Sequence, residues 1–411
     1  MHSRLTVLTF ASGLVLAAVI PLTVASCAST DNDGAPGDDA SARLDATFDF
    51  DGGDGSAPVD GGCDPSDPSC VTKPVGCDEA DWCPVPTNVD TLYALVRVWG
   101  TGPNDVWATG SGATVIHWDG TSWVPTPVPS PDPVPIKDTF RALWASGPND
   151  VWIASATDRI FHCDGFKNGT ATWELTPSAT AADHDRTSLL SAWGTSADDV
   201  RFGGRSSQNV DSQEYELANQ VVRVPSEKGI AWRRAPGTFA INGFWGTSAD
   251  DLWVVADNRP FFPQTVGMTL HGTRSSGAKD LTWKEIDSRT ENVLRGIWGT
   301  SNGDVWAVGD NGTVRHFGPD TNAAEWSIVS VPTKENLHAV WGSGPKDVWI
   351  VGESGTILHW DGDEWTESVA AFPVYRTKPH LYSIWGSGPK DVWIVGNDIA
   401  LHFTGTKGGT K

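Results

Sequence analysis

The chain has 411 residues, with 51 acidic residues against 29 Lys and Arg, a formal net charge of −22, 44 glycines, 27 prolines and 22 tryptophans. Helical domains are rich in Ala, Leu, Glu and Lys, so this abundance of Gly, Pro and Trp indicates an all-β protein with many turns. The acidic charge excludes nucleic acid as a partner, because nucleic-acid binding depends on Lys and Arg that neutralise phosphates.

The first segment has the features of an export signal. Arg4 precedes an apolar run over 5–20, and residues 24–27 read Val-Ala-Ser-Cys. This order is typical of a signal peptide that ends in small residues. The last four residues resemble the lipobox of bacterial lipoproteins, which implies that Cys27 is lipidated and becomes the mature N-terminus. A plain secretory signal that is cleaved nearby is the alternative.

The lipobox resemblance also implies a location. Several acyl chains anchor a protein stably where one does not, so the membrane is the first expected partner. Ala28 and Ser29 differ from the Asp that retains some bacterial lipoproteins at the inner membrane. We therefore expect an exported protein that is lipid-anchored at the outer membrane or cell surface. No later apolar run approaches the roughly 18 residues that a membrane-spanning helix needs.

An acidic segment follows over 28–81, with 14 acids and 2 bases. It consists mainly of Gly, Ala, Ser, Pro and Asp, which predicts a disordered, solvated tether. The run Asp49–Asp54 places Gly53 where an EF-hand loop needs an acidic ligand, so we expect a spacer there, not a calcium site. The predicted domains are a signal peptide over 1–26, a lipidated tether over 27–76 and a folded domain over 77–411.

Four cysteines lie close together at Cys63, Cys70, Cys77 and Cys83. An even set in an exported protein indicates disulfides, and of the three possible connectivities we predict the local pairs Cys63–Cys70 and Cys77–Cys83. The spacing does not fit the short gaps of zinc sites. Cys163 remains and is expected to be a packing residue.

The rest of the chain repeats one unit of about 45 residues seven times. Every one of the 22 tryptophans occupies one of four positions in this unit. The first position is followed by Gly or, once, Ala, and it is filled by Trp99, Trp144, Trp193, Trp245, Trp298, Trp341 and Trp385.

Each unit is predicted to form four short strands. In the sixth copy they cover 337–341, 347–351, 356–360 and 364–369. Four strands per unit, seven times, indicate a seven-bladed β-propeller, and a solenoid of the same units is the alternative. The seventh copy ends near Phe403 without its fourth strand, and Trp82 precedes the first copy as an extra fourth-strand residue. We therefore predict that an N-terminal strand closes the ring.

A constant Asp follows the first Trp of each unit by six residues. These residues are Asp105, Asp150, Asp199, Asp251, Asp304, Asp347 and Asp391. Short oxygen-bearing side chains cap backbone amides in such turns, so we expect structural capping. Most copies also carry a His in the third strand, namely His117, His162, His271, His316, His359 and His402. One residue per blade cannot converge on a single ion, so no metal site is expected.

The repeated unit resembles Asp-box propellers, which include sialidase-like and photosystem-assembly-factor-like repeats. Asp119-Gly120-x-x-Trp123 and Asp361-Gly362-x-x-Trp365 match the Asp box, which in that family joins strands three and four. The unit is also similar to tectonin-type lectin repeats. The resemblance covers 82–405 and implies a fold without implying an activity. The third copy departs most, with Arg201 in a Trp position and Arg223 in the His position.

The sequence favours a non-enzymatic protein. It lacks the His-Glu-x-x-His, Gly-x-Ser-x-Gly, phosphate-loop and Gly-x-Gly-x-x-Gly motifs. It also lacks the Phe-Arg-Ile-Pro-like signature of sialidases, which leaves a sialidase-like glycoside hydrolase as a remote alternative. We expect no catalytic residue and no cofactor.

A binding site is expected where the repeat is broken. The position three before the first Trp varies in the innermost strand, and there we place Arg141, Asn242, Arg295, His338 and Tyr382 at the channel mouth as ligand-binding residues. That these side chains bind only water is the alternative. Loops over 125–137, 179–187 and 259–267 are expected to border the same face. The predicted function is a protein-binding or assembly scaffold for an envelope protein, and the alternative is a lectin-like module for a surface glycan.

Overall fold

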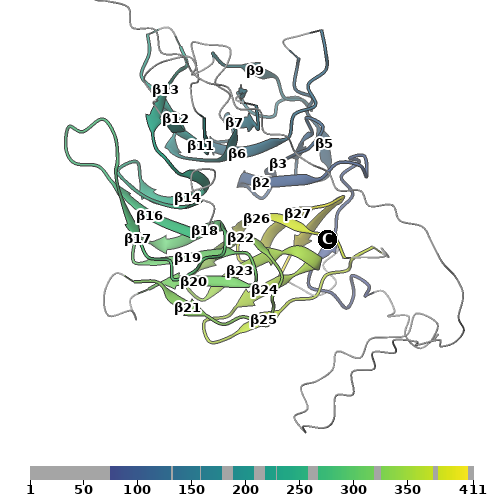
Figure 1. Ribbon diagram of the computed structural model, residues 1–411. Coiled ribbons are helices and arrows are strands. Elements are labelled where there is room, and N and C mark those ends of the chain that lie inside the picture. Colours follow the sequence, from purple (N-terminus) through teal and green to yellow (C-terminus); the bar gives the residue numbers. More distant parts are fainter. Residues whose placement is uncertain are drawn as a thin grey trace, which may run out of the picture. The chain divides into compact units, whose positions relative to one another are not determined.

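The computed structural model describes residues 75–405 apart from 131–132, 158, 178–187, 208–217, 228, 258–266, 319–324 and 374–377. They belong to one compact unit, Val71–Lys411. Figure 1 shows this unit as a ring of small sheets. Within the described part, none of the helical segments is long and apolar enough to cross a membrane.

The described chain forms seven four-stranded antiparallel sheets, which are the blades of a β-propeller (Figure 1). This confirms the predicted all-β, seven-bladed fold. A 3₁₀ turn, η2 (Glu353–Gly355), joins two strands of the sixth blade. In chain order the strands are β1 (Cys83–Pro84); β2 (Leu95–Gly102), β3 (Asp105–Gly110), β4 (Val115–Trp118) and β5 (Trp123–Pro125) of blade 1; β6 (Phe140–Gly147), β7 (Asp150–Ser155), β8 (Ile160–Cys163) and β9 (Trp173–Leu175) of blade 2; β10 (Leu189–Ser196), β11 (Asp199–Ser207), β12 (Ala218–Val224) and β13 (Ala231–Pro236) of blade 3; β14 (Ala240–Ser248), β15 (Asp251–Asp257), β16 (Gly267–Thr273) and β17 (Thr282–Ile286) of blade 4; β18 (Leu294–Ser301), β19 (Asp304–Gly309), β20 (Thr313–Phe317) and β21 (Ser327–Val329) of blade 5; β22 (Leu337–Gly344), β23 (Asp347–Gly352), β24 (Ile357–Trp360) and β25 (Trp365–Glu367) of blade 6; and β26 (Leu381–Gly388), β27 (Asp391–Gly396) and β28 (Ile399–Phe403) of blade 7.

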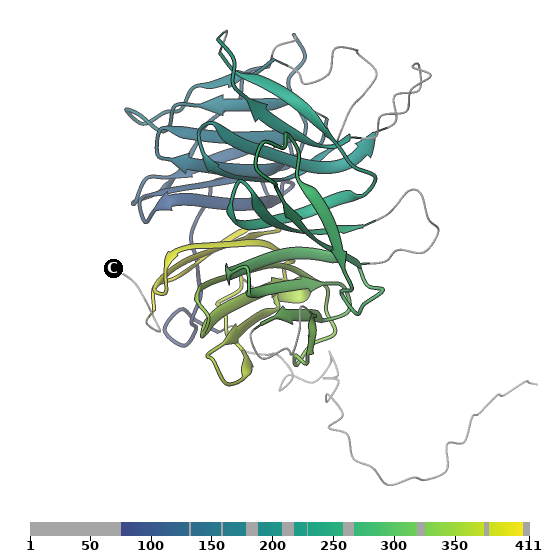
Figure 2. The same cartoon turned by 90° about the vertical axis from the view of Figure 1, so that its left-hand side faces the viewer.

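The first strands of the blades line the middle of the ring. Each of them contacts the first strand of the next blade, and β26 of the last blade contacts β2 of the first. Figure 2 shows the last blade, in yellow, beside the first blade, in purple-blue. The chain therefore closes on itself, and the solenoid alternative is wrong.

The N-terminal strand β1 completes the last blade. Cys83 pairs with His402 of β28 in antiparallel register. Trp82 is 0% exposed, and its indole Nε1 donates a hydrogen bond to Ser368 Oγ at 3.1 Å. Ala371 N donates to the Trp82 carbonyl at 2.9 Å, so the same residue also joins blade 7 to the end of blade 6. This confirms that an N-terminal strand closes the ring.

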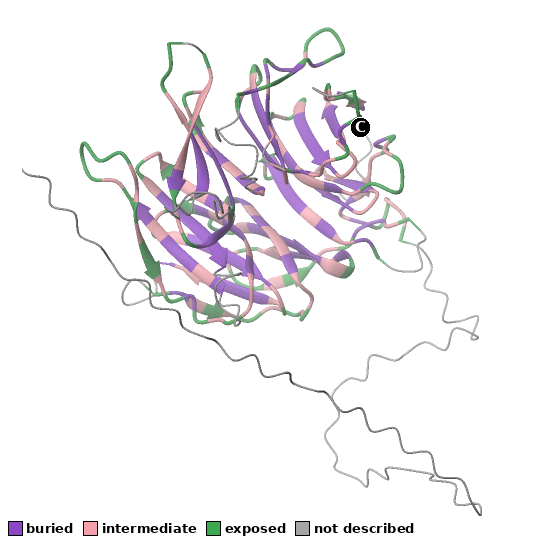
Figure 3. Ribbon diagram, turned by 45° about the horizontal axis from the view of Figure 1, so that its top comes forward, coloured by how far each residue is buried: buried purple, intermediate pink, exposed green. Residues whose placement is uncertain are grey.

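The tryptophans link neighbouring blades in a regular way. A second-strand tryptophan of one blade meets the fourth-strand tryptophan of the next blade edge to face, with ring centroids 5.1 to 5.5 Å apart. Such pairs are favoured over stacked rings because the positive edge of one ring meets the negative face of the other. No tryptophan is exposed, and Figure 3 shows the buried residues running along the strands. The pairs are Trp107–Trp173, Trp152–Trp232, Trp253–Trp326, Trp306–Trp365, Trp349–Trp82 and Trp393–Trp123.

The Trp-Gly pair of the first strand forms a second joint between blades. A Cβ on Gly342 would lie 2.6 Å from Trp298 Cη2 of the preceding blade, and one on Gly386 would lie 2.6 Å from Trp341 Cη2. Glycine is needed there because the neighbouring indole occupies the space of a side chain.

The constant Asp residues tie three strands of a blade together. Asp347 Oδ2 accepts a hydrogen bond from Ser343 Oγ at 2.5 Å, and its Oδ1 accepts one from Trp349 Nε1 at 3.1 Å. His359 Nε2 lies 2.7 Å from the same Oδ1 atom. The role is structural as predicted, although the partners are side chains and not the backbone amides that we expected. Every predicted third-strand His pairs with the Asp of its own blade at 2.5 to 2.9 Å.

Blade 3 keeps four strands although its sequence departs from the repeat. Arg201 replaces the second-strand tryptophan, and its Nη2 donates to Asp199 Oδ1 at 3.2 Å and to the Ala249 carbonyl at 3.0 Å. The Arg223 guanidinium lies 5.2 Å from the ring centroid of Trp152 in blade 2. Cationic side chains thus take over the inter-blade contacts that aromatic rings make elsewhere.

Two of the cysteines in the cluster lie within reach of each other. The Cα atoms of Cys77 and Cys83 are 5.5 Å apart, a separation at which a disulfide can form. Cys63 and Cys70, and with them the predicted lipidation site Cys27, lie outside the described residues. Cys163 is 1% exposed, and burial raises the pKa of its thiol, which fits the expected packing role.

Candidate functional site

A cavity of about 630 Å³ lies where the first strands converge, at the face where they begin. This volume is in the range of about 300–1,000 Å³ that is common for ligand pockets. The structure brings together all five residues that the sequence singled out. Arg141, Asn242, Arg295, His338 and Tyr382 each line the cavity.

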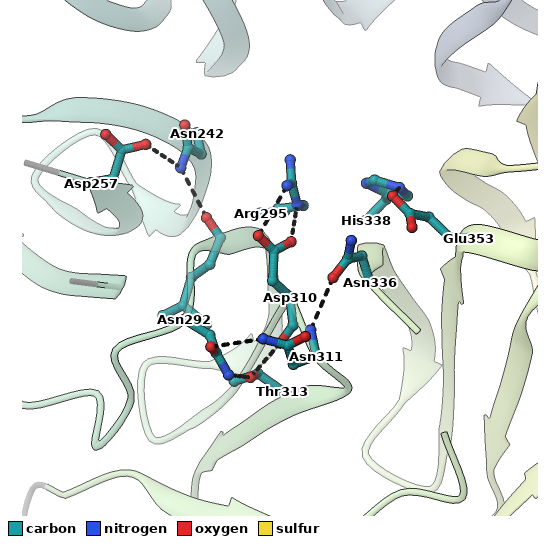
Figure 4. A network of polar contacts seen from close by, with 11 residues as sticks. Asn242, Asp257, Asn292, Arg295, Asp310, Asn311, Thr313, Asn336, His338 and Glu353 are labelled. Carbon is teal, nitrogen blue, oxygen red and sulfur yellow. Dashed lines mark hydrogen bonds and ion pairs between the residues drawn. The ribbon is translucent and has the colours of Figure 1, made fainter. Parts of the chain in front are cut away.

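Two positions of each blade meet at this cavity. The first-strand position three before Trp lines it in all seven blades, and the second-strand position six after the constant Asp lines it in blades 1, 2 and 3. In blade 5 the Arg295 guanidinium donates to both carboxylate oxygens of Asp310, at 2.5 and 3.1 Å (Figure 4). In blade 4, Asn242 Nδ2 donates to Asp257 Oδ2 at 3.3 Å and to the Leu294 carbonyl at 2.9 Å.

Blade 6 repeats this arrangement with a histidine. His338 Nε2 lies 3.6 Å from Glu353 Oε1 (Figure 4). Burial, followed by the nearby Arg295, lowers the pKa of His338 to about 4. The ring is therefore neutral at pH 7 and packs edge-on against Tyr382, with centroids 5.2 Å apart. Burial also raises the pKa of the Tyr382 phenol.

The loops beneath this wall are held by side-chain amides. Asn292 Nδ2 donates to Thr313 Oγ1 at 2.9 Å, and Asn311 Nδ2 donates to Asn292 Oδ1 at 3.1 Å. The backbone N–H of Asn311 donates to Asn336 Oδ1 at 3.0 Å (Figure 4). This network ties the loop that carries Asp310 to the segments that precede β18 and β22.

Arg97 lines the cavity at a position that the sequence analysis did not single out. Its Nη1 donates to the Val96 carbonyl at 2.9 Å, and its Nη2 donates to the Leu190 carbonyl of blade 3 at 3.0 Å. Burial and the neighbouring charge of Arg141 lower the pKa of Arg97 to about 10. A signal was present, since the other six copies have only Gly, Ala or Ser at this position, two before Trp.

Arg205 is the second residue that the sequence analysis missed. It follows Asp199 by six residues and lines the cavity from the end of β11. The equivalent positions of blades 4, 5 and 6 carry acids, so the reversed charge in blade 3 was visible in the sequence.

The three loops that were expected to border this face are described only in part. Residues 178–187 and 258–266 lie outside the described part, as do 131 and 132 of the first loop. Within that first loop Val134 is 71% exposed. Among the described side chains there is no group of three His, Cys, Asp or Glu residues that could hold a metal ion.

The seven four-stranded sheets define the class of the protein as a seven-bladed β-propeller, and its first strands surround the cavity. No protein-family model matches the sequence, and no curated protein matches it. Several solved propellers share the fold. A structure entitled "YCF48 bound to D1 peptide" is 17% identical with a TM-score of 0.55, and the match covers 80% of this chain and 96% of that one.

Two further solved structures show the same likeness. YCF48 from Cyanidioschyzon merolae is 16% identical with a TM-score of 0.57, over 78% of this chain and 98% of that chain. The WD40 β-propeller domain of Doa1 is 11% identical with a TM-score of 0.56, over 80% and 98% of the two chains. At these identities the likeness concerns the fold alone.

Proposed function

We propose that the protein is a non-enzymatic scaffold that binds a polypeptide partner at the central cavity. One observation carries this proposal: the polar residues that vary at the first-strand position three before Trp all line one cavity. A packed propeller does not require polar side chains there, and such side chains are suited to fixing a ligand by hydrogen bonds. The similar propeller with a bound D1 peptide supports a polypeptide as the occupant.

The proposal includes export and a lipid anchor at Cys27, on the outer membrane or cell surface. It rests on the signal-like residues over 1–27 and on the acidic segment that follows them. A tether of this kind would hold the propeller away from the lipid surface and leave its cavity accessible to an envelope protein.

Site-specific photo-crosslinking in intact cells tests this function. A photoreactive amino acid at Val96, which lines the cavity, is expected to capture a defined protein that binds again when both are purified. The matched position is Asp363, which is exposed in the hairpin between β24 and β25 and should capture nothing. In the same cells, Cys27→Ser should move the protein out of the membrane fraction.

Other outcomes would refute the scaffold. Capture from Asp363 alone would place the partner away from the cavity. Saturable binding to a glycan array, competed by free sugar, without any protein captured at Val96 would favour the lectin-like alternative.

A further inference from the structure

The charges of the cavity wall are distributed unevenly around the ring. In blades 4, 5 and 6 the second-strand position carries an acid that faces the polar residue of its own blade. In blades 1, 2 and 3 the same position is Ser111, Ala156 and Arg205. The acidic partners are therefore confined to three consecutive blades on one side of the ring.

Three arginines lie on the other side, and we call Arg97, Arg141 and Arg205 the arginine sector. All three line the cavity, and Arg141 and Arg205 are exposed. Within the described residues none of them has a carboxylate within ion-pair distance, whereas Arg295 is held by Asp310 at 2.5 Å. No carboxylate of the described residues therefore neutralises these three guanidinium groups, although the protein has a net charge of −22.

Like charges that converge without counter-charge repel one another. The lowered pKa of Arg97 reflects this cost, since the charge of Arg141 adds to the effect of burial. An anion bound between the guanidinium groups would remove the repulsion and form charge-assisted hydrogen bonds. The arginine sector therefore has the charge and the hydrogen-bond donors of an anion-binding site.

We propose that the arginine sector binds the side-chain carboxylates of an acidic peptide segment of the partner. This inference rests on the proposed function, which makes the occupant a polypeptide, and it adds the chemistry by which that polypeptide is recognised. The planar guanidinium fork matches a carboxylate in two parallel hydrogen bonds. Tyr382 and Asn242 line the same cavity, so a peptide bound there would also contact these two side chains.

Fluorescence anisotropy with the full chain tests the proposal. The probe is a labelled short peptide of alternating Glu and Gly, compared with the same peptide carrying Gln or Lys in place of Glu. We expect the Glu peptide to bind despite the acidic net charge of the protein, the other two not to bind, and added salt to weaken the complex.

The decisive variant is Arg141→Gln with Arg205→Gln. Because hydrogen bonds to charged groups are among the strong ones, we expect affinity to fall at least about tenfold. The matched control is Lys279→Gln with Lys284→Gln, which removes the same charge from exposed positions on the outer part of blade 4 and should leave affinity unchanged. Both pairs involve exposed residues, and unchanged circular dichroism will show that the fold is intact.

Three results would overturn the inference. If the Gln peptide bound as tightly as the Glu peptide, the protein would not recognise the negative charge of the peptide. If the Arg141/Arg205 variant kept its affinity, the binding site would lie elsewhere. An oligosaccharide of uronic acids that binds the sector while the Glu peptide does not would reassign the ligand. If these failures occur while Val96 still captures a protein partner, the scaffold function stands and only the acidic specificity is lost.

Discussion

At the scale of single residues, the constant Asp of each turn is a hydrogen-bond centre within its blade. Burial by itself raises the pKa of the Asp347 carboxyl, but hydrogen bonds from His359 and Ser343 outweigh it, and the pKa falls below the usual value. The pKa values of Asp105, Asp150 and Asp304 are also lowered, because side-chain hydrogen bonds, first of all from the His of the same blade, outweigh the effect of burial. Each of these carboxylates therefore stabilises the fold in its ionised form.

This arrangement predicts that acid destabilises the propeller. A native pKa below the unfolded value of about 3.9 means that the unfolded chain binds more protons, so stability is present above that pH and is lost as pH falls through the native pKa. The neutral His338, with its native pKa of about 4, adds to the loss between about pH 6.5 and pH 4. We expect the melting temperature to fall steadily from pH 6 to pH 3.

The control for this titration is Asp347→Asn, which removes one ionisable centre. This variant should melt lower at pH 7 and lose less on acidification than the parent. A melting temperature that stays constant down to pH 3 would contradict the role assigned to the carboxylates.

The candidate site shows what residue patterns can and cannot predict. Arg141 and Arg295 occupy the same repeat position, and comparison of that position alone did not distinguish them. In the structure Asp310 neutralises Arg295, while Arg141 lines the cavity without a carboxylate partner among the described residues. Arg97 and Arg205 were missed because neither belongs to the position that was compared. Which charges remain available depends on contacts between strands, and these contacts arise only when the sheet forms.

At the scale of the elements, the sequence placed the strands well and their ends less well. In blade 6 the first strand was predicted over 337–341 and reaches Gly344, because Gly344 still pairs with Asp347 across the tight turn. The fourth strand was predicted over 364–369 and is shorter, covering Trp365–Glu367. It is the outermost strand of its blade, and the propensities of its own residues do not show where pairing with β24 stops.

Gly342→Ala tests the Trp-Gly joint between blades 5 and 6. The added methyl would lie 2.6 Å from Trp298 Cη2, so we expect a loss of about 1–3 kcal/mol in the free energy of unfolding by urea. Gly344→Ala in the same strand is the matched control, because a Cβ there meets nothing within 4 Å. The joint would be refuted if both variants unfolded at the same urea concentration.

At the scale of the whole propeller, the ring depends on contacts between the two ends of the repeat. Trp82 precedes the first blade in sequence and is buried against Trp349 and Phe403, with ring centroids 5.1 and 5.2 Å away. A four-stranded blade in which one strand comes from the opposite end of the domain cannot form before the ring closes. Closure therefore couples the stability of the last blade to that of the first.

Replacing Trp82 tests this coupling. Trp82→Ala removes a fully buried indole and should destabilise the full chain by about 3–5 kcal/mol, measured by thermal or urea unfolding. Leu92→Ala is the control from the same N-terminal stretch, since Leu92 is 84% exposed. Deletion of 81–85 should have an effect at least as large as Trp82→Ala. If Trp82→Ala melts like Leu92→Ala, the first strand does not close the ring.

The sequence by itself determined the seven blades, their four strands, the closing strand and the scaffold role of the tryptophans. Each of these features is written in a local pattern that recurs every 45 residues or so, and periodic burial dictates the strands. Only the tertiary structure decided which breaks in the pattern act together. In the folded protein Asp310 pairs with Arg295 and neutralises its charge. Arg97, Arg141 and Arg205, which belong to three blades, line the same side of one cavity. The physical reason is that electrostatic interactions depend on distance in space, and side chains from different strands and blades come to fixed distances only when the sheets and the ring have formed.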